Sequence, residues 1–142
     1  MNTLRKLAFP LVLLAFLAAL FAWRNPFWAG RPEVFETGTF EQAMSKADAC
    51  GRALVVDAMA SWCGPCKSMD AWTWPSAKVT DWVRSNAVAF QFDVDKSPEL
   101  AERFGIQAMP TVIVLKGGEE VARHAGALSA GEMVDWLEAN AK

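Results

Sequence analysis

The chain has 142 residues, of which 53% are hydrophobic and 21% are charged, and its formal net charge at pH 7 is −2. These values exclude an intrinsically disordered chain, and the length favours one domain over two. No basic patch suggests nucleic acid and no glycine-rich loop suggests a phosphate site, so neither class of function is expected.

The N-terminal segment predicts a membrane anchor. Residues 7–23 carry no charge, and as a helix they would span about 26 Å, near the short limit for crossing a bilayer. Arg5 and Lys6 precede this run, so the positive-inside rule would keep the N-terminus cytoplasmic and export the chain beyond Trp23. A signal peptide cleaved after Ala22 is the alternative, although Leu20 then stands where small residues are preferred. A buried core helix is disfavoured, because the run has no polar face.

We therefore assign residues 1–30 to a signal anchor and linker, and residues 31–142 to a separate domain that carries all 16 acidic side chains. Trp23, Phe27 and Trp28 are expected in the interfacial belt of the membrane, where amphipathic rings collect.

Helical and strand patterns alternate through the remaining chain. Thr39 and Gln42 predict a capping box that opens a helix ending at Gly51, and Ser129 and Glu132 predict a second capping box. The predicted helices cover residues 40–49, 67–72, 75–86, 98–104 and 130–137. The predicted strands cover residues 53–60, 87–95, 111–116 and 120–126.

This order of elements predicts an α/β fold. The apolar run 53–60 suits a central strand that is buried on both faces. The short turn between the last two strands implies an antiparallel hairpin. The sequence therefore predicts a central mixed sheet with helices on both faces.

Two cysteines come directly after the strand 53–60, in the stretch SWCGPCK. At the first turn of a helix, unpaired N–H groups and the helix dipole favour the thiolate of Cys63, which we expect to be open to solvent. Cys66 would lie one turn inward and shielded, able to close a disulfide with Cys63. Pro65 fits a first helical turn, where its missing N–H has no partner to lose. One attacking and one resolving thiol is the arrangement that thiol–disulfide exchange needs.

Three other interpretations of the pair remain. A zinc site needs about four ligands, and the chain offers only Cys50 and His124 besides the pair, so we expect no metal. A purely structural disulfide stabilises little when it closes so short a loop. An inert buried pair is the third, and Gly64 and Pro65 between the cysteines disfavour it.

The stretches VVDAMASWCGPCK, AMPT (108–111) and AGALS (125–129) resemble the thioredoxin family. The likeness runs from about residue 35 to residue 142, and the combination of motifs is far more specific than a lone C-x-x-C. It implies a thioredoxin fold, a protein-disulfide reductase activity and no cofactor. By resemblance, Cys63 is the nucleophile, Cys66 the resolving thiol, Asp57 the proton acceptor for Cys66, and Pro110 a cis-proline facing the disulfide.

The same resemblance implies a groove for the substrate. Its members would be Trp62, Gly64, Pro65, Met109 and Gly126. The backbone of Met109 would pair with an extended substrate segment. Trp62 could equally be ordinary packing beside a helix start.

The residues themselves also argue for a special Asp57. A carboxyl group within the apolar strand 53–60 should have a raised pKa because of desolvation, and could then accept a proton near neutrality. An aspartate turned to solvent from the strand end is the alternative.

Two features depart from typical thioredoxins. Gln91 stands where they carry a lysine near the buried acid, so proton transfer could be tuned differently. The segment 68–83 is longer and more aromatic than in a small cytosolic thioredoxin. It is more similar to the C-terminal thioredoxin-like domain of the membrane reductase that carries electrons into the bacterial periplasm. Within it, Trp72 and Trp74 could widen a partner surface or fill the core.

Cys50 and His124 are not assigned to the site. About 23 Å of strand separates Cys50 from Cys63, whereas a disulfide needs Cα atoms within about 7 Å. We therefore expect Cys50 to be a small apolar filler and His124 to be solvated on an edge strand.

These features predict a single-pass inner-membrane protein whose domain lies in the periplasm, or a periplasmic protein if the N-terminus is cleaved. It would reduce disulfides in client proteins by a cycle of Cys63 and Cys66, with electrons from a membrane thiol-reductant donor. A thioredoxin-fold binding or assembly module with dispensable cysteines is one alternative, and a disulfide-forming oxidase is another.

Overall fold

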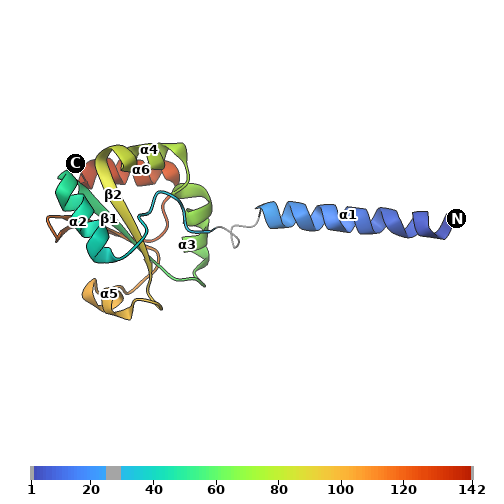
Figure 1. Ribbon diagram of the computed structural model, residues 1–142, viewed down its shortest axis with the longest axis horizontal. Coiled ribbons are helices and arrows are strands. Elements are labelled where there is room, and N and C mark those ends of the chain that lie inside the picture. Colours follow the sequence, from blue (N-terminus) through green and yellow to red (C-terminus); the bar gives the residue numbers. More distant parts are fainter. Residues whose placement is uncertain (1, 25–29, 142) are drawn as a thin grey trace.

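The computed structural model describes residues 2–24 and 30–141. An N-terminal helix, α1 (Asn2–Arg24), lies apart from an α/β domain (Figure 1). The predicted interfacial residues Phe27 and Trp28 lie outside the described residues. Among the residues described, no helix combines the length and the apolar character needed to cross a bilayer, and the predicted membrane span stays a prediction.

A four-stranded mixed sheet forms the centre of the domain. Its strands, in spatial order, are β2 (Ala87–Asp93), β1 (Ala53–Met59), β3 (Thr111–Lys116) and β4 (Glu119–Ala125). Strand β1 pairs parallel with β2 and antiparallel with β3, and β3 and β4 form the predicted antiparallel hairpin. The predicted mixed sheet is confirmed.

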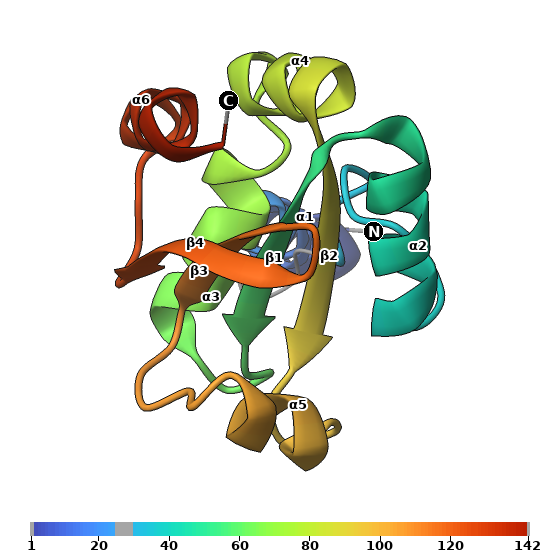
Figure 2. The same ribbon diagram turned by 90° about the vertical axis from the view of Figure 1, so that its left-hand side faces the viewer.

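Helices cover both faces of this sheet (Figure 2). They are α2 (Phe40–Cys50), α3 (Gly64–Ser68), a π-helical turn η2 (Met69–Thr73), α4 (Ala77–Asn86), α5 (Pro98–Arg103) and α6 (Ala130–Asn140). Both predicted capping boxes are present at the starts of α2 and α6, and Gly51 ends α2 with a left-handed φ of 62°. Each such cap contributes about 1 kcal/mol to the stability of its helix.

The two faces of the sheet carry separate hydrophobic clusters. On one face Val55, Val112 and Val114 pack with residues of η2, α4 and α6. On the other face Leu54 and Val56 pack with residues of α2 and with the partly buried side chains of α5. Successive side chains of a strand point to opposite faces, so the central strands β1 and β3 and the edge strand β2 are buried on both faces. Asp57, two residues after Val55, lies on the face of η2, α4 and α6.

The structure corrects the prediction between β1 and β2. The predicted helix 67–72 begins earlier, at Gly64, and changes into the π-helical turn at Met69. The predicted helix from Pro75 begins two residues later, because Ser76 accepts a hydrogen bond from the backbone N–H of Val79 and so caps α4.

Candidate active site

The cysteine pair lies where β1 passes into α3. Cys63 and Cys66 form a disulfide with an S–S distance of 2.07 Å and a Cα–Cα distance of 5.3 Å. Cys63 caps α3, and the backbone N–H of Cys66 donates to Cys63 Sγ at 3.2 Å. That donor stabilises negative charge on Sγ when the disulfide is reduced, as a reactive thiolate requires. Gly64 and Pro65 supply the first two residues of α3.

The expected contrast in exposure between the two cysteines is wrong for this oxidised state. Cys63 is only 5% exposed and Cys66 is 2% exposed. Ala60 is buried with the pair, and the partly buried side chains of Met59 and Met109 pack against it. The Cys63 sulfur is therefore covered by its neighbours as long as the disulfide is closed.

Two distant segments meet at the disulfide. The Met109–Pro110 peptide bond is cis, as predicted, and Met109 packs against the cysteines. The backbone N–H of Gly126 donates to the carbonyl oxygen of Pro110 at 2.8 Å. Gly126 has a φ of 113°, a conformation that residues with a Cβ rarely adopt. The structure thus places Met109, Pro110 and Gly126 together, as the predicted groove needs.

Trp62 is not packed into the core. Its side chain is 65% exposed, and its Nε1–H donates to Asp95 Oδ2 at 2.7 Å. The alternative of ordinary packing is therefore wrong. A large exposed ring held in one orientation beside the cysteines can contact a partner.

Asp57 is buried within β1, the strand that leads to the cysteine pair. It is 2% exposed, so the alternative of an aspartate turned to solvent is wrong. Its Oδ2 accepts hydrogen bonds from Trp74 Nε1–H and Gln91 Nε2–H, both at 3.0 Å, and its Oδ1 has no hydrogen-bond partner among the described residues. Burial raises the pKa of Asp57 to about 7, against the opposing effect of the Gln91 hydrogen bond. The carboxyl group can therefore take up or release a proton near neutrality.

Asp70 belongs to the same group of polar side chains, although the sequence prediction does not include it. It is buried, and Gln91 Nε2–H donates to its Oδ1 at 2.7 Å. Two signals in the sequence could have indicated this. Asp57 and Gln91 lie on adjacent strands at facing positions, and Asp70 comes about one helical turn after Cys66.

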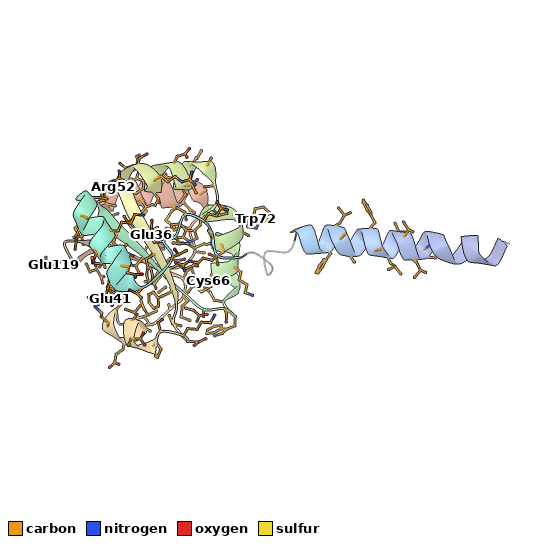
Figure 3. All side chains as sticks on the ribbon, viewed as in Figure 1. Glu36, Glu41, Arg52, Cys66, Trp72 and Glu119 are labelled. Atoms are coloured by element: carbon orange, nitrogen blue, oxygen red, sulfur yellow. A yellow bond between two sulfur atoms is a disulfide. The ribbon has the colours of Figure 1, made fainter. Side chains whose placement is uncertain are left out.

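The two tryptophans of the aromatic segment have different roles. Trp74 is fully buried and packs edge-to-face on Phe35, with ring centroids 4.8 Å apart. Trp72 is exposed and projects from the surface of the domain, whereas Cys66 lies within it (Figure 3). Trp74 fills the core and binds Asp57, and Trp72 is available to a partner.

The prediction that Cys50 is a buried filler is wrong, because it is an exposed free cysteine. The buried face of α2 consists of Phe40, Ala43 and Ala47, and Cys50, the last residue of the helix, lies outside it. His124 lies on the edge strand β4 as expected, but it is only partly exposed and its ring contacts Trp136.

Comparison with known proteins gives consistent matches. The family model described as Thioredoxin matches residues 32–139. Thioredoxin H2-2 of Oryza sativa subsp. japonica is 40% identical over 76 residues, which cover 54% of this chain and 54% of the rice protein. The chain therefore matches about half the length of that relative.

Two further matches cover a larger share of the matched protein. A thioredoxin of Echinococcus granulosus is 39% identical over 90 residues, which cover 63% of this chain and 79% of that protein. The crystal structure of thioredoxin NaTrxh from Nicotiana alata has a TM-score of 0.61 at 27% identity, covering 80% of this chain and 96% of the other.

Proposed function

The chain belongs to the thioredoxin family of disulfide oxidoreductases, and on that premise we propose that it reduces disulfides in extracytoplasmic client proteins. The observation that carries this proposal is the Cys63–Cys66 disulfide, packed against Met109 before the cis Pro110, together with a buried carboxyl group, Asp57, in the strand that leads to it.

The first step is attack on the client. The reduced Cys63 thiolate, stabilised by the Cys66 N–H, attacks one sulfur of the client disulfide. A bond forms between Cys63 Sγ and that sulfur, and the client S–S bond breaks. The second client sulfur leaves as a thiolate with the bonding electron pair and takes a proton from solvent.

The second step resolves the mixed disulfide. The Cys66 thiol gives its proton to Asp57, whose pKa near 7 lets it act as the base at neutral pH. The Cys66 thiolate attacks Cys63 Sγ, and the bond from Cys63 to the client sulfur breaks. The client leaves with both of its sulfurs reduced, and Cys63–Cys66 is oxidised.

The proposed direction is reduction. Gly64 and Pro65 between the cysteines are typical of reducing members of the family, which is the basis for this direction. The protein must then regain two electrons after each turnover, and we assign their supply to a membrane thiol-reductant donor.

The proposed location is the periplasmic side of the inner membrane, with α1 as a single-pass anchor. Apolar side chains of α1 are exposed around the helix, among them Leu11, Val12 and Phe16. A helix that is apolar all round is stable in lipid rather than in water. Arg5 and Lys6 precede it and favour a cytoplasmic N-terminus.

Reduction of insulin disulfides by the full chain in detergent, with dithiothreitol as electron source, tests this function. We expect Cys63→Ser to abolish activity above the dithiothreitol background, because the attacking sulfur is lost. Cys50→Ser is the matched control and should keep full activity, since Cys50 is exposed and outside the site. Activity that survives Cys63→Ser would favour a binding module with dispensable cysteines.

A further inference from the structure

A chain of hydrogen bonds joins Asp57 to a second buried carboxyl group. Gln91 Nε2 donates to Asp57 Oδ2 at 3.0 Å and to Asp70 Oδ1 at 2.7 Å. A side-chain amide nitrogen carries two hydrogens, so this single atom serves both acids and has no further donor to give. All three side chains are buried.

The fold brings these groups together from three elements. Asp57 in β1 and Gln91 in β2 occupy facing positions of the parallel pair. Asp70 comes from η2, where the backbone N–H of Trp74 donates to the carbonyl of Met69, five residues earlier. Such single π-helical turns are rare and often occur at functional sites. Asp70 lies within this turn and Trp74 follows it directly. The turn therefore positions Asp70, which accepts from Gln91, and Trp74, which donates to Asp57.

The hydrogen bonds leave one atom of Asp57 for the reaction. Oδ2 accepts from both Gln91 and Trp74, whereas Oδ1 is buried and, within residues 2–24 and 30–141, has no hydrogen-bond partner. Buried carboxylate oxygens almost always have a partner, so an oxygen without one is a candidate for a chemical role. A proton taken from Cys66 would therefore be held on Oδ1, while Oδ2 keeps the carboxyl group in place.

Asp70 differs from Asp57 in its access to water. It lines a cavity of about 430 Å³, together with Arg31, Lys67 and Lys96. Burial raises the pKa of Asp70, but the Gln91 hydrogen bond and the charges of Arg31 and Lys67 oppose this effect. On Asp57 the one charge among the main causes is that of Asp70, and it raises the pKa of Asp57 further. The cations and the cavity favour the ionised form of Asp70, and burial and the charge of Asp70 favour the protonated form of Asp57, so we assign the proton to Asp57.

We propose that Asp70, held by Gln91, is a positioning residue for the resolving step, because its negative charge keeps Asp57 basic enough to accept the Cys66 proton. The charged side chains on the wall of the same cavity are Arg31, Lys67, Lys96 and Asp93. Of these, Arg31 and Lys67 lower the pKa of Asp70. This inference rests on the proposed function, since it concerns the release of a reduced client.

The proton balance of the step is complete. The proton moves from Cys66 Sγ to Asp57 Oδ1, and Asp70 stays ionised throughout. The Cys66 thiolate forms the bond to Cys63 Sγ, and the client sulfur leaves with the electron pair of the broken bond. Asp57 then returns its proton to solvent.

The experiment measures resolution as a function of pH, with the full chain in detergent. The reduced protein is mixed with an aromatic disulfide that releases one coloured thiolate on attack by Cys63 and a second one on attack by Cys66. The rate of the second phase is measured between pH 5 and pH 9. Asp70→Asn keeps an oxygen that can accept from Gln91 but removes the charge, so the midpoint should move by about one pH unit to lower pH. The plateau rate should fall as well, because a weaker base accepts the proton less readily.

Two further variants separate charge from general damage to the fold. Asp70→Glu keeps the charge and should restore a midpoint close to that of the natural chain. Gln91→Met removes the hydrogen bond that lowers the pKa of Asp57, so its midpoint should move to higher pH, opposite to Asp70→Asn. An unchanged midpoint in Asp70→Asn, or shifts of both variants in one direction, would overturn the inference.

A readout without turnover keeps this inference distinct from the proposed function. The Asp57 carboxyl titration, measured by ¹³C NMR in the oxidised chain, should show the same opposite shifts in the two variants. Loss of insulin reduction by the natural chain with these shifts intact would refute the proposed function. Full insulin reduction without the shifts would refute only the role of Asp70.

Discussion

The buried acid makes a specific prediction about stability. Burial raises the pKa of Asp57 from 3.8 to about 7. Between these two values the unfolded chain has released the Asp57 proton while the folded chain keeps it, so the free energy of unfolding falls as the pH rises. A difference of about three pKa units corresponds to about 4 kcal/mol, lost between about pH 4 and pH 8.

The substitution Asp57→Asn should remove this fall in the free energy of unfolding with rising pH. The amide oxygen can still accept from Gln91 and Trp74, and the amide group never ionises. We therefore expect the variant to match the natural chain within about 1 kcal/mol at pH 4 and to exceed it by about 4 kcal/mol at pH 8. Asp70 also has a raised pKa and contributes to the slope of both proteins, and its charge acts on Asp57, so the difference between the two proteins reports the ionisation of Asp57 together with this coupling.

Guanidinium unfolding of the oxidised chains, monitored by tryptophan fluorescence from pH 4 to pH 9, measures this difference. The oxidised state keeps Cys63 and Cys66 out of the titration. The reasoning is refuted if the gap between the two proteins stays constant over this range, or if it widens towards low pH. The same variant should resolve mixed disulfides slowly, so its gain in stability at pH 8 should accompany a loss of turnover.

Two other predictions concern the groove and the N-terminus. Gly126→Ala should lower the free energy of unfolding by about 1–3 kcal/mol and weaken insulin reduction, because its φ of 113° disfavours any residue with a Cβ. The matched control Gly131→Ala, inside α6, should gain up to about 1 kcal/mol in denaturant unfolding and keep its activity. N-terminal sequencing of the protein from isolated membranes should find the residues before Leu7 still attached. A mature N-terminus at Trp23 would instead show a cleaved signal peptide.

Much of the fold can be predicted because its central strands are apolar on both faces. The run 53–60 and the strand 111–116 can be located within a residue, since a fully buried strand has few polar positions to obscure its ends. The π-helical turn cannot be predicted in this way. It inserts one residue into a helix of only a few turns, and so small a change leaves no detectable shift in the periodicity of apolar residues. The exposure of Cys50 likewise depends on which side chains the rest of the fold packs against the end of α2, and local sequence does not specify this.

The site can be predicted where its residues are close in sequence or belong to the motifs of the family. Asp57, Cys63 and Cys66 lie within ten residues, so one strand and one helix start are enough to place them. The joint contact of Gln91 with Asp57 and Asp70 depends on strand pairing and on the π-helical turn together. Sequence patterns indicate each element by itself, and they do not indicate which side chains meet across elements.

The separate clusters on the two faces of the sheet have a consequence for engineering. Around Phe40 and Leu54 the buried side chains are apolar, and the Arg103 guanidinium packs over the Phe40 ring. This cluster lies apart from Asp57, so it can be repacked to raise the melting temperature while the redox chemistry stays constant. The opposite face holds Asp57. Its ionisation lowers the free energy of unfolding, and the same ionised form is the base that the catalytic cycle uses. Substitutions meant to raise thermal stability should therefore be made on the face covered by α2. Substitutions on the opposite face are expected to raise stability at the expense of activity.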